Sequence, residues 1–266
     1  MKFRYVLADS IQKFIEGSTL EEINIGCSSS QVIRIMKNDQ IYFLKIMENS
    51  VLLLEYQKLL WLEGKLPVAK VVLFEEENGV FYLITEEVKG YMLSDSYYQS
   101  HVDQALKVIE SAFKQFYTID IKDCPFGFDL QSYLQNVRSK YLQGLILDEQ
   151  LSSNVKKRFG TILHLLDYLE ENQFFDEPVF SFGDLSLPNM IAIKDRLSGF
   201  VDVGSCGIFG KWFDIAICEK SIRRNLGEEA VLEFYQILNL KRNGCSGSVP
   251  LRQHWGWEFM WELPQK

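Results

Sequence analysis

The sequence of 266 residues is poor in cysteine and histidine, with 5 cysteines and 3 histidines. It has no Cys-x-x-Cys pair and no histidine spacing typical of a zinc site. An odd number of scattered cysteines predicts reduced thiols and therefore a cytoplasmic protein. The first residues show no secretory signal, and no run approaches the roughly 18 apolar residues that a membrane span needs. We therefore expect an intracellular protein without structural disulfides, structural zinc or a transmembrane helix.

Positive charge is also in deficit, because 28 Lys and Arg stand against 36 Asp and Glu, a formal net charge of −8. Nucleic-acid-binding domains usually show a basic face, so this balance argues against nucleic acid as a partner. A cleft lined with carboxylates attracts cationic small molecules, although an acidic surface also serves solubility alone. Internal repeats and low-complexity segments are lacking too. Hydrophobic residues make up 47% of the chain, enough to bury a core in one large domain or in two lobes.

The first 90 residues show the alternation and turn signals of β-strands. Asn38-Asp39 separates two apolar stretches and predicts a hairpin. Asn78-Gly79 is a strong turn signal and predicts a second hairpin. Leucines with helical spacing lie between the two hairpins, and Gly64 stops the helix that they predict. The expected strands are 31–36, 41–46, 71–74 and 80–85, and the expected helix is 51–62.

After Gly90 the pattern changes to helices, as in the 3.6-residue apolar stripe of 102–116. The two patterns predict an α+β fold. Its small antiparallel β-sheet lobe with one helix spans 1–88, and its larger, mainly helical lobe spans 89–266. Further helices are expected at 129–143, 152–173, 211–225 and 228–239, and short strands at 178–182, 190–193 and 198–202.

The short strands bracket a polar loop, Ser181-Phe-Gly-Asp-Leu-Ser-Leu-Pro-Asn189, and a later strand leads into Asp202-Val-Gly204. Phosphoryl transfer needs a carboxylate to orient the acceptor hydroxyl and oxygen ligands for Mg²⁺. Asp184 would supply the first, as catalytic base, and Asn189 and Asp202 the second. Each motif alone is more often an ordinary turn. Their order along the chain, however, is the one that kinase-like phosphotransferases use, and it predicts a protein-kinase-like two-lobed fold.

The N-terminal half contains possible partners for this chemistry. Lys45 lies late in an apolar strand, and Glu55 follows ten residues later in the expected helix. Kinases use such a pair to hold the α- and β-phosphates, although each residue alone is more often a solvated surface group. Upstream, the small residues of 25–32 would let backbone N–H groups approach phosphate oxygens, or would simply form a polar hairpin turn.

Taken together, these motifs resemble those of the aminoglycoside phosphotransferase family, in particular its 3′-phosphotransferases. The similarity covers about residues 10–240. Its most specific stretches are 60–68, 120–125, 179–189, 199–204 and 211–216.

The resemblance implies roles for individual residues. Ser28 would be a phosphate-loop serine, Phe43 would stack on adenine, and Lys45 with Glu55 would form the pair that holds the phosphates. The adenine edge would bind the backbone of Glu86 and Val88. Asp184 would be the catalytic base, Asn189 and Asp202 the Mg²⁺ ligands, and Glu228 and Glu229 the carboxylates that bind ammonium groups of the acceptor.

The implied activity is transfer of phosphate from ATP, or GTP, to a hydroxyl of an aminoglycoside, which confers antibiotic resistance. The implied partners are the nucleotide, Mg²⁺ and this cationic small molecule, without nucleic acid or membrane, in a monomer or weak dimer. Acidic residues suit a polycationic acceptor because charge-assisted hydrogen bonds are stronger than neutral ones.

The sequence departs from the family pattern at several places. Phe182 replaces a histidine that supports the loop, and Ser205 and Gly210 replace an arginine and an aspartate. Acidic residues expected near 151–154 are missing, and the tail 241–266 does not resemble the family's C-terminal helix. Two alternatives therefore stay open: a kinase of another cationic or sugar-like acceptor, and a catalytically impaired nucleotide-binding homologue.

Overall fold

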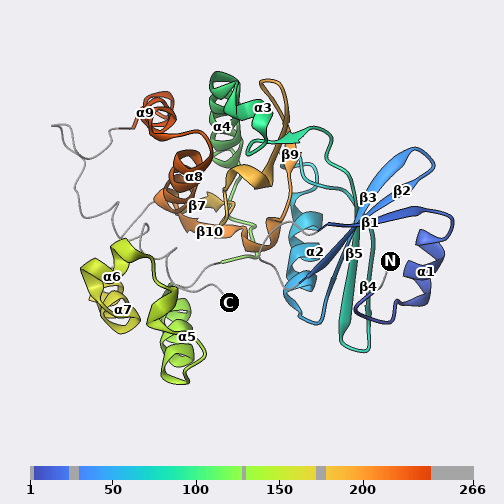
Figure 1. Ribbon diagram of the computed structural model, residues 1–266, viewed down its shortest axis with the longest axis horizontal. Coiled ribbons are helices and arrows are strands. Elements are labelled where there is room, and N and C mark those ends of the chain that lie inside the picture. Colours follow the sequence, from blue (N-terminus) through green and yellow to red (C-terminus); the bar gives the residue numbers. More distant parts are fainter. Residues whose placement is uncertain (1–2, 24–29, 128–129, 172–177, 241–266) are drawn as a thin grey trace. The chain divides into compact units, whose positions relative to one another are not determined.

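The computed structural model describes residues 3–23, 30–127, 130–171 and 178–240, whose helices and strands are drawn in Figure 1. The chain divides into two compact units. Unit 1 comprises Met1–Leu93 and Pro188–Ser205, and unit 2 comprises Ser94–Leu187 and Cys206–Lys266. Residues 188–205, although late in the chain, thus belong with the N-terminal residues.

Unit 1 is built around a five-stranded antiparallel sheet in the order β1-β2-β3-β5-β4 (Figure 1). Both predicted hairpins are confirmed. Asn38 and Asp39 take positive φ values of 49° and 60° in the first turn, and Asn78 and Gly79 values of 52° and 79° in the second. Such turns match the twist of the paired strands. The strands are β1 (Thr19–Ile23), β2 (Gln31–Lys37), β3 (Gln40–Met47), β4 (Val71–Glu77) and β5 (Val80–Glu86).

Two helices accompany this sheet: α2 (Val51–Leu62), as predicted, and α1 (Asp9–Ile15), which the sequence pattern did not indicate. Side chains alternate between the two faces of a strand. Leu44 and Ile46 of β3 are fully buried in a cluster that includes Ile11 of α1. Lys45 lies between them and therefore points to the opposite face, where it meets α2. The apolar alternation of β3 thus directs one lysine toward α2.

A second, three-stranded sheet of unit 1 has the order β6-β8-β9. Its strands are β6 (Tyr91–Met92), β8 (Met190–Ile193) and β9 (Arg196–Phe200). The Phe200 N–H donates to the Pro67 carbonyl at 2.8 Å. This contact brings the backbone of Pro67 so close to Gly199 that a Cβ there would lie 2.6 Å from the Pro67 oxygen and 3.0 Å from a methyl carbon of Val88. Glycine is required at this position by close backbone approach.

We expect Gly199→Ala to lower the free energy of unfolding by about 1 to 3 kcal/mol, because the added methyl forces β9 away from Pro67. Urea denaturation measures the change. Gly127→Ala is the matched control, since a Cβ at Gly127 meets no atom within 4 Å. Equal stability of the two variants would contradict the prediction.

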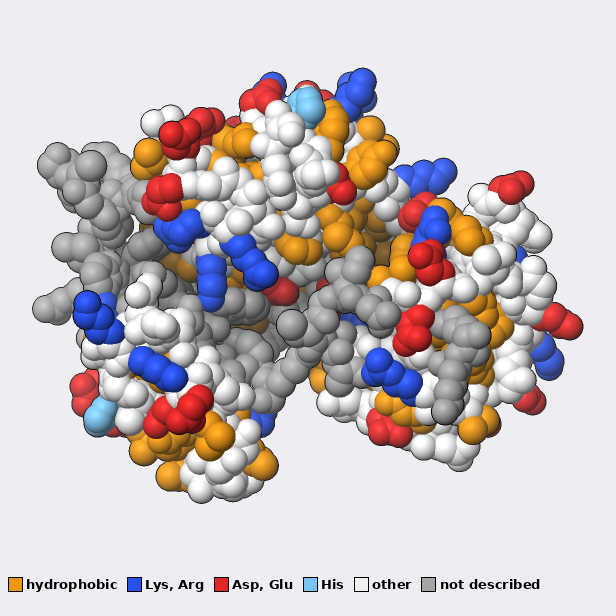
Figure 2. Space-filling model, viewed as in Figure 1, with side chains coloured by type: hydrophobic (Ala, Val, Ile, Leu, Met, Phe, Trp, Pro, Cys, Tyr) orange, Lys and Arg blue, Asp and Glu red, His pale blue; other side chains and the backbone are white. Residues whose placement is uncertain are grey.

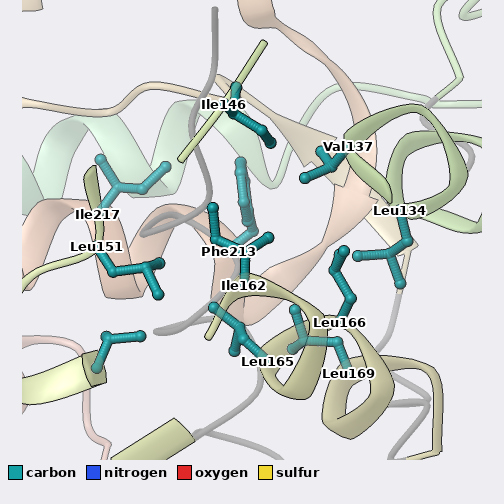
Figure 3. Packing of buried hydrophobic residues seen from close by; sticks show 11 residues of the cluster. Leu134, Val137, Ile146, Leu151, Ile162, Leu165, Leu166, Leu169, Phe213 and Ile217 are labelled. Carbon is teal, nitrogen blue, oxygen red and sulfur yellow. The ribbon is translucent and has the colours of Figure 1, made fainter. Parts of the chain in front are cut away.

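Unit 2 is mainly helical and also contains a two-stranded antiparallel sheet of β7 and β10. One cluster of buried side chains joins α5, α7 and α8; it includes Phe213 and Ile217 of α8 and leucines of α7 (Figure 3). The elements are α3 (Ser96–Gln99), α4 (Val102–Phe116), α5 (Leu130–Leu142), α6 (Ser153–Phe159), α7 (Ile162–Glu171), β7 (Pro178–Ser181), β10 (Gly207–Gly210), α8 (Lys211–Asn225) and α9 (Glu228–Ile237).

One predicted helix of unit 2 is wrong. The stretch 152–173 was expected to be continuous, but the structure has α6 and α7 with a break between them. Gly160 ends α6 at a φ of 75°, a conformation that glycine adopts readily. The Thr161 hydroxyl then accepts from the His164 N–H at 3.2 Å and caps α7. The predicted strand 198–202 is also shifted, since β9 ends at Phe200.

Acidic and basic side chains are interspersed on the face shown in Figure 2. Within the described residues, no helix combines the length and the apolar character needed to cross a membrane.

Candidate active site

The centre of the site in unit 1 is the Lys45 ammonium, which lies between two carboxylates. Lys45 Nζ is 2.7 Å from Oε2 of Glu55 and 2.9 Å from Oδ1 of Asp202. The side chains of Lys45 and Glu55 are 21% and 9% exposed, whereas that of Asp202 is 55% exposed. Strand β3, helix α2 and the segment after β9 therefore each contribute one charged group, and the most accessible of the three is Asp202.

Burial and the neighbouring charges shift the pKa values of Lys45 and Glu55. Burial by itself would lower the pKa of the Lys45 ammonium, but Glu55 and Asp202 outweigh it and hold that pKa above its usual value. Burial raises the pKa of the Glu55 carboxyl; the Lys45 charge opposes this shift, and the Asp202 charge adds to it. Lys45 is therefore a cation at neutral pH.

The β8–β9 hairpin brings the two predicted metal ligands to the same end of unit 1. Met190 pairs with Phe200, and one step further the Val201 N–H donates to the Asn189 carbonyl at 3.1 Å. Asp202 follows directly, with a φ of 58° that turns the chain away from the strand direction. The amide oxygen of Asn189 and the carboxylate of Asp202 are the hard oxygen donors that Mg²⁺ prefers, and two such ligands suffice where phosphates complete the shell. The donor set fits the metal.

The residues predicted to bind the nucleotide base also lie in unit 1. Phe43 is half-buried in β3, directly opposite Thr85 of β5. Glu86 ends β5, and its N–H donates to the Lys70 carbonyl at 2.9 Å. Val88 follows and is half-buried beside Gly199. Ser28, the predicted phosphate-loop serine, lies outside the described residues.

Asp184, the predicted base, belongs to unit 2 and is half-buried in a loop that starts after β7. Gly183, just before it, has a φ of 77°. The Asp184 carbonyl accepts from the Ser186 N–H at 2.8 Å, and the Leu187 N–H donates to the Ser221 hydroxyl of α8 at 2.9 Å. The backbone on both sides of Asp184 is therefore fixed by short hydrogen bonds.

The loop is also held by Asp214 of α8, a residue to which the sequence analysis gave no role. The Asp214 carboxylate accepts the Phe182 N–H at 2.7 Å and the Gly183 N–H at 3.0 Å. Burial raises the pKa of Asp214 to about 6, and the neighbouring Asp184 charge adds to this, although hydrogen bonds from Phe182, Ser181 and Gly183 oppose it. The sequence signal for this role is a carboxylate among apolar residues in Lys211-Trp-Phe-Asp-Ile-Ala216.

Phe182, where the family pattern has histidine, is fully buried. Its ring stacks on that of Phe116, with centroids 5.9 Å apart and planes inclined by 27°. Phe116 itself lies at the end of α4. Phe182 therefore attaches the loop to the apolar core through its ring contact with Phe116. This contact and the hydrogen bonds to Asp214 together hold the loop in position.

The two predicted acceptor-binding carboxylates begin α9 in unit 2, and both residues are exposed. Glu228 forms an ion pair with Arg223, whose Nε lies 2.7 Å from Glu228 Oε2. Arg223 also pairs with Glu219, which accepts the Tyr235 hydroxyl at 2.6 Å. The charge of Glu228 is thus partly compensated within the chain.

Comparison with known proteins identifies the family. Residues 19–243 match the model of a phosphotransferase enzyme family. An aminoglycoside 3′-phosphotransferase of Staphylococcus aureus is 33% identical over 246 residues, covering 88% of this chain and 92% of that protein. The structure of an aminoglycoside 3′-phosphotransferase of type VIII superposes with a TM-score of 0.78 at 22% identity, with 96% of each chain covered.

A further solved structure, an aminoglycoside phosphotransferase of Streptomyces rimosus in complex with ADP and streptomycin, superposes with a TM-score of 0.74. It is 18% identical and covers 95% of both chains. These likenesses confirm the predicted α+β, kinase-like fold, and the sequence match confirms the predicted relationship. The chain belongs to the aminoglycoside phosphotransferase family.

Proposed function

We propose that this protein transfers the terminal phosphoryl group of ATP to a hydroxyl of an aminoglycoside antibiotic. The observation that carries the proposal is the Lys45 ammonium held between Glu55 and Asp202. An ammonium group has three N–H donors, so two carboxylates leave one donor for a phosphate oxygen. The name of the Staphylococcus aureus relative supports the same reaction.

The residues of unit 1 would bind the nucleotide. Phe43 would contact the adenine ring, and the Glu86 carbonyl and Val88 N–H would bind its edge. Asn189 and Asp202 would hold Mg²⁺, which when bound neutralises charge on the phosphates. The N-terminal lobe, predicted as 1–88, is accordingly proposed as the nucleotide-binding lobe, and 89–266 as the lobe with the catalytic loop and the acceptor site. Within the latter range, residues 188–205 belong to unit 1.

Asp184 would act on the acceptor. Its carboxylate would accept a hydrogen bond from the acceptor hydroxyl and take the proton as the new O–P bond forms. The fixed backbone around it, through Asp214 and Ser221, supports a defined orientation. Glu229 and Glu228 would bind ammonium groups, with Glu229 the stronger candidate because Arg223 pairs with Glu228.

Mass spectrometry of kanamycin and neomycin, after incubation with the protein and ATP, tests the proposal. With Mg²⁺ we expect an adduct of one phosphate, and chelation of Mg²⁺ with EDTA should abolish it. If ADP binds but no aminoglycoside is modified, the acceptor belongs to another class or transfer is impaired, and the proposal is wrong.

A further inference from the structure

A second lysine of α2, Lys58, is buried although the proposed reaction assigns it no role. Lys58 is only 9% exposed, and a lysine is rarely so buried unless its ammonium group has partners. Lys58 lies three residues after Glu55, so both project from the same side of the helix. Its Nζ donates to the Gly204 carbonyl at 2.7 Å.

Gly204 lies two residues after Asp202, in the short 3₁₀ turn Val203–Ser205 that packs on α2. Its Cα faces Glu55 directly, since a Cβ on Gly204 would lie 3.7 Å from the Glu55 Cβ. A hydrogen bond from a charged donor is roughly twice as strong as a neutral one. Helix α2 therefore contacts the segment that carries Asp202 through two neighbouring side chains, Glu55 by close packing and Lys58 by a hydrogen bond.

These contacts matter because the backbone conformation of Asp202 is unfavourable by itself. Its φ of 58° lies in the left-handed region, which an L-residue keeps only when its surroundings determine it. Ser205 is exposed and lacks the charge of the arginine in the family pattern. Lys58 instead brings a cation to the same segment from α2.

We propose that Lys58 is a positioning residue for Mg²⁺: by holding the Gly204 carbonyl, it keeps the Asp202 carboxylate oriented toward the metal. The inference rests on the proposed function, in which Asp202 is a metal ligand. It distinguishes Lys58 from Lys45, which would meet the phosphates whether or not the metal is bound, and from Glu55, which pairs with Lys45.

Calorimetric titration with ADP, in excess Mg²⁺ and again in EDTA, tests this separation. In Lys58→Met, which keeps length and removes charge, we expect affinity for ADP with Mg²⁺ to fall roughly tenfold and affinity without metal to change less than about twofold. Lys58→Arg restores a cationic donor and should bind like the wild type.

Lys65→Met is the matched control. Lys65 also donates to a backbone carbonyl, that of Trp61 at 2.6 Å, but this bond is exposed and leads to no site residue. It should change neither affinity.

Equal weakening of both titrations in Lys58→Met would overturn the inference, since Lys58 would then act through Lys45 and Glu55 or through general stability. So would an unchanged affinity with Mg²⁺, or a loss in Lys58→Arg as large as in Lys58→Met. If the wild type itself bound ADP no better with Mg²⁺ than without it, the proposed function would fail first.

Discussion

Replacement of Asp184 by asparagine is expected to lower kcat for aminoglycoside phosphorylation about a thousandfold. The neutral amide has nearly the same shape, but its oxygen is a poor acceptor for the proton of the attacking hydroxyl. The Asp184 carbonyl bond to Ser186 involves the backbone and is retained, so the loop keeps its conformation. Because the nucleotide is assigned to unit 1, the affinity for ADP should stay within about twofold. Steady-state kinetics and calorimetry measure the two quantities.

Asp195→Asn is the matched control, because Asp195 is exposed in the turn between β8 and β9. This variant removes the same charge nearby in the sequence and should leave kcat unchanged. If Asp184→Asn kept more than about a tenth of the wild-type kcat, general base catalysis by Asp184 would be excluded.

The sequence predicted best those elements whose determinants are local. Helix α2 begins and ends at the predicted residues, 51 and 62, and the hairpins turn at Asn38-Asp39 and Asn78-Gly79. In each case a few neighbouring residues set the backbone conformation, so no knowledge of distant contacts is needed.

Elements that depend on distant partners were missed. Strand β10 is four residues long and exists because Gly207 pairs with Ser181 of β7. A Cβ at Gly207 would lie 2.7 Å from the Phe126 carbonyl, so the strand is also confined by a third segment. Helix α1 likewise owes its place to burial of Ile11 among sheet residues. Neither of these long-range contacts can be recognised in a short window of sequence.

The same distinction applies to the site. The charged residues Lys45, Glu55 and Asp202 were predicted from their order and spacing, and the structure places them in contact. Lys58 and Asp214 were not predicted, because each holds its part of the site through hydrogen bonds to backbone atoms. A backbone partner leaves no motif in the sequence, and only a charged residue at a buried helix position indicates it.

Asp214→Asn is expected to lower kcat about a hundredfold at neutral pH, because a displacement of about 1 Å at a catalytic group has an effect of this size. The amide has one acceptor oxygen where the carboxylate has two, so only one of the N–H groups of Phe182 and Gly183 keeps this partner. Steady-state kinetics measures the loss.

The stability of Asp214→Asn should depend on pH differently from that of the wild type. The Asp214 carboxyl has a pKa of about 6 in the folded protein against 3.8 for an ordinary aspartate. Between these pH values the folded wild-type protein keeps a proton that its unfolded chain has lost. The free energy of unfolding of the wild type therefore falls as pH rises. The fall amounts to roughly 3 kcal/mol and levels off above the folded pKa.

Asparagine does not titrate, so the difference in unfolding free energy between wild type and Asp214→Asn isolates this group. We expect that difference to shift in favour of the variant across the window from 3.8 to about 6 and to stay constant above it. Urea denaturation across this window measures the shift. A constant difference would show that Asp214 is not buried as a raised-pKa acid. Loss of activity together with the expected shift would show that Asp214 is retained because it holds the loop of Asp184, at the expense of stability at neutral pH.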